Sequence, residues 1–222
     1  MTETGSYGRE LALRAFELFR ALEPEARNVM GEAPSGGSLY PTFLLSMAMP
    51  IIIQPYERFF EIDNPKKSAL MVEFDGYEPN SPLAKGLDEL KDMTNLSGSP
   101  FDKAKWHYAF LRGTYKLVDG ISEDLERHLN NPAAAVKAQR KRPKVVLGIL
   151  RHALAHGSIV YLDQEEQPSI YGPVEHFLFA NSRPNGIVEF LKVNVEDFKM
   201  FITAWAKWLR DHDGRGEDLP SQ

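Results

Sequence analysis

The sequence of 222 residues contains no cysteine. This absence excludes disulfide bonds, thiolate zinc sites and thiol catalysis, and it is compatible with a reducing cytoplasm, where we expect the protein to reside. The N-terminus lacks a basic region followed by an apolar core, so we expect no secretory signal. The longest apolar run, at 42–53, is too short to span a bilayer and contains Pro50. We therefore expect a buried core element there, and no membrane partner.

Positive charge is also scarce, because 26 lysines and arginines stand against 31 acidic residues, for a net charge of −5. The chain as a whole therefore does not attract nucleic acid electrostatically. The local exception is 137–144, "KAQRKRPK". Such a run can gather phosphates, and it can equally be the solvated end of a helix. The candidates for RNA binding in this run are Lys137, Arg140, Lys141, Arg142 and Lys144.

Composition and length predict one globular domain over residues 1–222, since 43% of the residues are hydrophobic and 26% are charged. We expect a polar, loose tail from about residue 212. Helical spacing and cap signals predict a mainly α fold, with helices over 8–22, 42–53, 81–93, from Ser99 onward, 122–131, 143–156 and 194–211. Short strands are predicted at 158–163, 175–181 and 186–193, so that a small antiparallel sheet of about three strands precedes the last helix.

Several helix ends carry recognisable cap residues. Ser81 and Ser122 are predicted to cap the helices that follow them, and Gly157 stands where a left-handed C-terminal cap is expected. Ser99 and Pro100 are predicted to open a further helix. That helix would direct Trp106, Phe110 and Leu117 toward the core.

The stretch "LRHALAHG", residues 150–157, holds Arg151, His152 and His156 on a predicted helix. Because successive helical residues turn by about 100°, His152 and His156 share a face, whereas Arg151 and His156 are separated by roughly 140°. Gly148 and Ala155 leave a shallow face that lets a second helix approach. A two-fold mate would then bring a second Arg151 and His156 into the same cleft.

Three interpretations of these residues remain open. In a structural role, Arg151 is solvated or salt-bridged and both histidines edge a helix interface. Metal binding is suggested by the i, i+4 spacing of His152 and His156, but no glutamate lies between them and only Asp163 and His176 suggest further ligands, so we predict no metal and no other cofactor. In phosphoryl transfer, a histidine moves a proton near neutral pH and an arginine neutralises a phosphate.

The run "RHALAHG", with its Arg-x4-His spacing, resembles the signature of the HEPN superfamily (higher eukaryotes and prokaryotes nucleotide-binding domains). The similarity extends to "PIIIQPYERF", the strands "SIVYLD" and "FLFAN", and the closing "VEDFKMFITAWAKWL". Together these segments cover most of residues 40–210 and are similar to a plasmid- and phage-associated bacterial subgroup. The resemblance implies a HEPN-like helical bundle that forms a homodimer through the motif helix.

The resemblance also implies a function, namely a metal-independent endoribonuclease that cleaves RNA in a cleft shared by two protomers, as in toxins and phage-defence effectors. Arg151 would hold the scissile phosphate, and His156 would act as general base on the 2′-hydroxyl or as acid on the leaving oxygen, giving a 2′,3′-cyclic phosphate. His152 would orient His156, share the proton transfer or pack. Ser158 would contact phosphate or complete the turn.

An antitoxin protein is a further partner that the resemblance implies. Some relatives carry a tyrosine two residues after the motif histidine, which such a partner modifies, and here Ser158 takes that place, with Tyr161 the nearest tyrosine. The sequence also leaves two other functions open: a non-catalytic RNA- or nucleotide-binding module, and a structural dimer.

Overall fold

The structure is a computed structural model that describes residues 7–31, 36–57, 81–113, 115, 121–169 and 172–212. Leu117 and the tail beyond 212 lie outside the described residues. Within these ranges the helices are α1 (Tyr7–Ala26), α2 (Tyr40–Pro55), α4 (Pro82–Asp92), α5 (Glu123–Asn130), α6 (Ala133–Gln139), α7 (Pro143–His156) and α8 (Val195–His212). The strands are β1 (His107–Arg112), β2 (Ile159–Leu162), β3 (His176–Ser182) and β4 (Ile187–Asn194). The prediction of a mainly α chain with a small sheet is confirmed.

The predicted caps are largely confirmed, because each supplies a partner that a helix end lacks. The hydroxyl of Ser81 accepts a hydrogen bond from the Ala84 amide at 3.2 Å, and that of Ser122 accepts one from the Leu125 amide at 3.3 Å. Gly157 has a φ of 68°, and its N–H donates to the Ala153 carbonyl at the end of α7. This left-handed residue turns the chain from α7 directly into β2.

The prediction of a helix that starts at Ser99 is wrong. Only a short 3-10 turn forms, at Pro100–Lys103, because Ala104 is already extended with φ −126° and ψ 146°. Trp106 is buried as expected, but Phe110 is 48% exposed and not in the core. The aromatic residues of this stretch alternate along the chain, a pattern that suits a strand better than a helix.

The predicted count of three strands is also wrong, since the described residues form a four-stranded sheet in the order β1-β4-β3-β2. The additional strand is β1, which pairs antiparallel with β4 although β4 lies far along the chain. The three predicted strands, β2 to β4, form antiparallel pairs immediately before α8, as expected. A local sequence pattern carries little information about such a distant partner.

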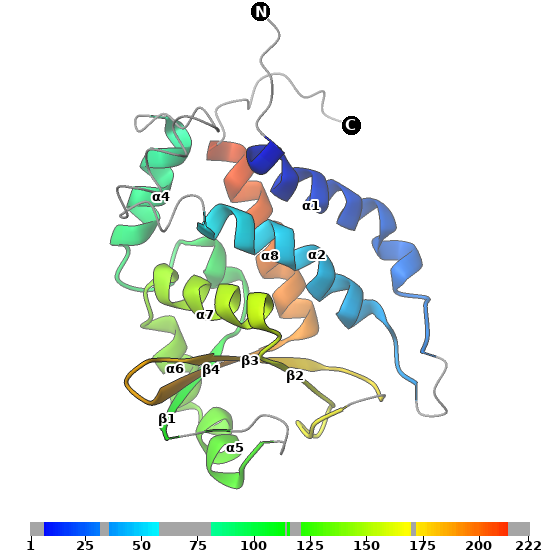
Figure 1. Cartoon of the computed structure of the whole chain (residues 1–222), viewed down its shortest axis with the longest axis vertical. Helices are drawn as coiled ribbons and strands as arrows, with labels where there is room; N and C mark the ends of the chain where they lie inside the picture. The colour runs from blue at the N-terminus through cyan, green and yellow to red at the C-terminus, as the bar shows by residue number, and fades with distance from the viewer. Residues whose placement is uncertain are drawn as a thin grey trace, which may run out of the picture.

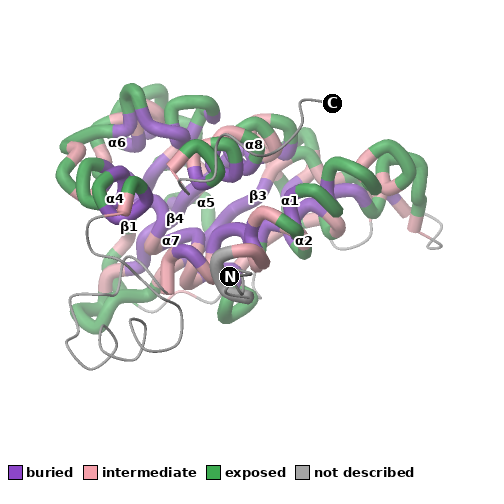
Figure 2. The backbone as a smooth tube through the Cα atoms, turned by 90° about the horizontal axis from the view of Figure 1, so that it is seen from above, coloured by how far each residue is buried: buried purple, intermediate pink, exposed green. Residues whose placement is uncertain are grey.

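Helices cover both faces of this sheet (Figure 1). One face carries Phe177, Phe179, Leu191 and Val193 and belongs to the main core, which also contains buried residues of α1, α2, α7 and α8. The other face packs against Leu125 and Leu129 of α5. Figure 2 shows β3 and β4 buried along most of their length, whereas α1 exposes an outer face.

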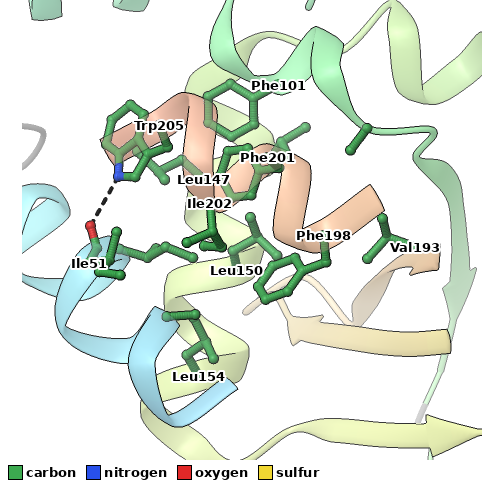
Figure 3. Close-up of a cluster of buried hydrophobic side chains, with 14 of the residues drawn as sticks. Ile51, Phe101, Leu147, Leu150, Leu154, Val193, Phe198, Phe201, Ile202 and Trp205 are labelled. Carbon is green, nitrogen blue, oxygen red and sulfur yellow. Dashed lines mark hydrogen bonds between the residues drawn. The ribbon is translucent and has the colours of Figure 1, made fainter. Parts of the chain in front are cut away.

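The centre of the main core is the apolar side of α7, where Leu147, Leu150 and Leu154 lie close to α2 and α8 (Figure 3). On α8, the indole N–H of Trp205 donates to the carbonyl of Ile51 in α2 at 3.0 Å. In a regular helix that carbonyl accepts the amide of the residue four positions later, which here is Pro55 and has no N–H. The indole therefore satisfies a carbonyl that proline leaves without its helical donor.

We predict that Trp205→Phe lowers the free energy of unfolding by about 1–3 kcal/mol, because it leaves the Ile51 carbonyl buried and unsatisfied. Urea unfolding measures the loss. Trp208→Phe is the matched control, since Trp208 is less buried and stacks on Trp205 at 5.3 Å between ring centroids. Pro55→Ala restores a backbone donor, so it should recover part of the loss in the Trp205→Phe background only. Equal losses for both tryptophans, with no rescue, would contradict this account.

Candidate functional site

The predicted site residues lie on the outward side of α7, opposite its buried stripe. Arg151 and His152 are half-buried, while Ala155 and His156 are exposed. On the other side of the helix, the inward residues have relative exposures of 3% or less, and they are Val146, Leu147, Ile149, Leu150, Ala153 and Leu154. Packing of this inward stripe therefore determines which residues α7 presents to solvent.

Arg151 forms an ion pair with Glu57, which lies directly after α2. Both Nε and Nη2 of Arg151 contact the Oε1 atom of Glu57. The Arg151 and Glu57 side chains are 26% and 30% exposed, and the guanidinium carbon lies 5.8 Å from the centroid of the Tyr56 ring. The sequence predicted a salt bridge for Arg151 only as one alternative, and it gave no signal for Glu57 as the partner.

His152 and His156 lie side by side, with 4.5 Å between ring centroids and 49° between ring planes. This contact confirms that the two rings share a face of α7. The pKa of His152 is lowered from its ordinary value, mainly by burial and further by the electrostatic influence of His156 and Arg151, so the fold disfavours a proton on this ring. In the part of the chain that the structure describes, no hydrogen bond or ring contact joins Arg151 to His156.

A pocket of about 320 Å³, which we call the cationic pocket, lies beside Arg151. Its lining residues are Tyr56, Lys144, Val145, Gly148, Arg151, His152, Asn181 and Arg183. Sequence reasoning missed Arg183, because it follows β3 in what looked like an ordinary turn. Arg183 donates to the carboxylate of Glu189 at 2.6 Å, and Glu189 also accepts from the Tyr108 hydroxyl at 2.9 Å.

The five basic residues of 137–144 separate in the structure. Lys144 lines the cationic pocket, while the Lys141 ammonium lies 3.8 Å from the centroid of the Tyr108 ring. Arg142 donates to backbone carbonyls at the end of α4, at 2.6 Å for Lys91 and 3.4 Å for Met93. The remaining two, Lys137 and Arg140, are exposed and do not line either pocket described here.

A second pocket, of about 360 Å³, adjoins the first and shares His152 with it. We call it the uncharged pocket, and its other lining residues are Gly113, Tyr115, Ser158, Ala180, Ser182, Gly186 and Val188. Of the two roles that the sequence suggested for Ser158, the role in the turn that ends α7 is confirmed, while a contact with phosphate stays a prediction. Ser158 lines this pocket, and its amide closes the end of α7 by donating to the Ala153 carbonyl at 3.0 Å.

No group of three or more metal-ligating side chains occurs among the described residues. Asp163 and His176, the two further ligands considered from sequence, lie at the opposite end of β2 from Ser158. Among the same residues, no helix has the length and apolar character needed to cross a membrane.

Comparisons with protein-family models, curated proteins and solved structures give no match to this chain. The HEPN resemblance therefore stays a prediction from sequence. The features of the molecule that bear on its function are the two pockets and the outward side of α7.

We predict that His156→Gln raises the pKa of His152, because it removes a neighbouring imidazole whose protonation disfavours a second proton on the half-buried ring. The pKa should still lie below the ordinary histidine value of 6.5, since burial persists. NMR titration of the His152 ring measures both values, and His128→Gln on α5 is the control. A pKa for His152 that is unchanged by His156→Gln would contradict the coupling.

The lowered pKa of His152 makes the stability of the fold depend on pH. Because the folded protein disfavours a proton on His152, the unfolded chain binds more protons between the lowered pKa and the unfolded value near 6.5. The contribution of His152 to stability is therefore complete above pH 6.5 and falls as the pH drops through that window. Urea midpoints measured across the window should fall less for His152→Gln than for the unchanged protein.

Proposed function

We propose that this protein is a metal-independent endoribonuclease that cleaves RNA by attack of the 2′-hydroxyl in a cleft shared by two protomers. The observation that carries the proposal is the outward side of α7. There Arg151 and His152 line the cationic pocket, together with Lys144 and Arg183, and the exposed His156 packs on His152. Three cationic side chains and two imidazoles thus lie on or beside the outward side of α7 in a chain whose net charge is −5.

The chemistry needs one group to accept a proton and one to donate it. A neutral imidazole takes the proton of the 2′-hydroxyl, whose oxygen attacks phosphorus. The bond from phosphorus to the 5′-oxygen breaks, and a protonated imidazole donates its proton to that oxygen. The products are a 2′,3′-cyclic phosphate and a 5′-hydroxyl. The lowered pKa of His152 favours its neutral form, which suits the accepting role, and Arg151 and Lys144 would stabilise the charge on phosphate.

A shared cleft follows from the divergence of Arg151 and His156. In one chain Arg151 contacts Glu57 while His156 contacts His152, so the two motif residues do not converge. The helix side between them carries Gly148, where the Tyr56 hydroxyl lies 3.5 Å from the position of a Cβ, and the exposed Ala155, over which a second helix could approach. A two-fold mate of α7 would bring its own histidine toward Arg151.

The Glu57 ion pair favours a second candidate function, a non-catalytic RNA- or nucleotide-binding module. Because the Glu57 carboxylate already neutralises part of the positive charge of the Arg151 guanidinium, less of that charge is left for a phosphate. If the protein only binds RNA or a nucleotide, the role of Arg151 is to hold α2 and α7 together. Under the ribonuclease proposal, phosphate competes with Glu57 for Arg151.

We predict that the purified protein cleaves single-stranded RNA in the presence of EDTA. Arg151→Ala or His156→Ala should each reduce the cleavage rate by about 100-fold or more, because each removes a group that acts in the transition state. Gel analysis and end-group assays measure rate and products. Arg127→Ala and His128→Ala on α5 are the matched controls, since both side chains are solvent-accessible and lie outside the pockets.

Sharing of the cleft has its own test. Arg151→Ala protein mixed with His156→Ala protein should recover roughly a quarter of the unmodified activity, because random pairing makes half of the dimers mixed and each mixed dimer holds one intact pair. No recovery would place the pair within one chain. Absence of cleavage on several RNAs, with RNA binding retained, would favour the binding module. Loss of cleavage on chelation, restored by zinc, would favour a metal site.

We predict that Glu57→Gln strengthens RNA binding by about threefold, because it removes a charge that competes with phosphate for a partly exposed arginine. The amide retains the shape of the side chain. Filter binding at constant salt measures the effect, and Glu126→Gln on α5 controls for the change in net charge. If Glu57→Gln and Glu126→Gln change RNA binding equally, Arg151 does not compete for phosphate in the way proposed.

A further inference from the structure

The cationic pocket and the uncharged pocket lie on opposite sides of the last residues of β3. Ala180 and Ser182 line the uncharged pocket, whereas Asn181 and Arg183 line the cationic pocket. This division follows from the strand itself, because successive side chains point to opposite faces of a sheet. One short segment of β3 and its turn thus supplies a wall to each pocket.

The edge of β3 between the pockets is not covered by β2. The pairing of β2 with β3 ends at Ile159 opposite Phe179, and the last backbone bond to this edge joins the Ala180 amide to the Ser158 carbonyl at 2.9 Å. Beyond that point β3 continues to Ser182 with β4 on its other side. His152 lies at this edge and lines both pockets.

The two pockets differ in chemistry. The cationic pocket is lined by Lys144, Arg151 and Arg183, whose charges suit a phosphate group. A phosphate there would compete with Glu57 for Arg151 and with Glu189 for Arg183. The uncharged pocket offers the ring of Tyr115 and the hydroxyls of Ser158 and Ser182, and none of the described residues that line it is an acid, a lysine or an arginine. Tyr115 is fixed in place, because its ring packs edge-on against Phe190 at 5.1 Å and its hydroxyl accepts from the Ser122 amide at 2.6 Å.

We infer that the two pockets together bind one nucleotide, with its phosphate in the cationic pocket and its base in the uncharged pocket, across the open edge of β3. Each pocket has the volume of a small binding site, at about 320 and 360 Å³. An aromatic ring beside polar hydroxyls suits a base, which has an apolar face and a hydrogen-bonding edge. The inference rests on the proposed function only in taking RNA as the source of that nucleotide.

The test is equilibrium binding of three probes, namely adenosine 3′-monophosphate, adenosine and inorganic phosphate, measured by calorimetry on the full chain. The nucleotide should bind at least about tenfold more tightly than either phosphate or adenosine alone, because only the nucleotide occupies both pockets. The measurement requires no cleavage, so it remains informative for a chain without ribonuclease activity. Nucleotide binding no tighter than phosphate binding would overturn the inference.

Two variants separate the pockets. Lys144→Gln should weaken both nucleotide and phosphate by about tenfold, as expected for loss of a hydrogen bond to a charged group. Lys207→Gln on α8 is its matched control, since it makes the same charge change at an exposed lysine outside both pockets. Ser182→Leu fills the uncharged pocket, so it should weaken the nucleotide by a similar factor and leave phosphate unchanged.

Each result on these variants has a defined meaning. Equal effects of Lys144→Gln and Lys207→Gln, or equal loss of phosphate and nucleotide with Ser182→Leu, would overturn the two-pocket site. If RNA is cleaved normally while Ser182→Leu does not affect nucleotide binding, the ribonuclease proposal stands and this inference fails. If the nucleotide binds as predicted and RNA is not cleaved, this inference stands and the ribonuclease proposal fails.

Discussion

The burial of one side of α7 is the constraint on which the rest of the structure depends. Leu147, Leu150 and Leu154 lose all or nearly all of their contact with water, and each such side chain contributes about 1.5–3 kcal/mol of stabilisation relative to exposure. Because this side must face α2, α8 and the sheet, the rotation of α7 about its axis is fixed. The side of α7 that faces solvent therefore carries Arg151, His152 and His156.

The packing around α7 also buries a backbone carbonyl of α2 that needs a donor from α8. Pro55 near the end of α2 removes the amide that would bond to Ile51, and the buried carbonyl needs another donor. Trp205 supplies it from α8, so a proline in one helix and a tryptophan in another are linked through one hydrogen bond. Tyr56 and Glu57 follow that proline directly, and Glu57 contacts Arg151. The end of α2 therefore connects the core to the candidate site.

Sequence reasoning succeeded where the signal is local. Ser122 caps the helix that begins one residue later, and Gly157 ends α7 by donating to the carbonyl of Ala153, four residues earlier. In both cases the cap residue and the helix end that it stabilises lie within a few residues of each other in the sequence. It failed where the partner is distant. β1 forms because β4 pairs with it, and Arg183 and Glu57 join the site only because packing brings the ends of β3 and α2 to α7. No spacing of residue types along the chain indicates that these distant segments lie next to one another.

The distribution of charge shows why the composition alone misleads about anion binding. Of the five cations in the basic run, Lys141 packs on an aromatic ring and Arg142 bonds to the carbonyls that end α4, so both serve the fold. Lys144 instead joins Arg183, which comes from another part of the chain, in one pocket. The local field at a pocket depends on which charges packing brings together and on the low-dielectric walls around them, more than on the net charge. A chain that is acidic overall can therefore gather cations in one pocket, as it does here between α7 and the turn that follows β3.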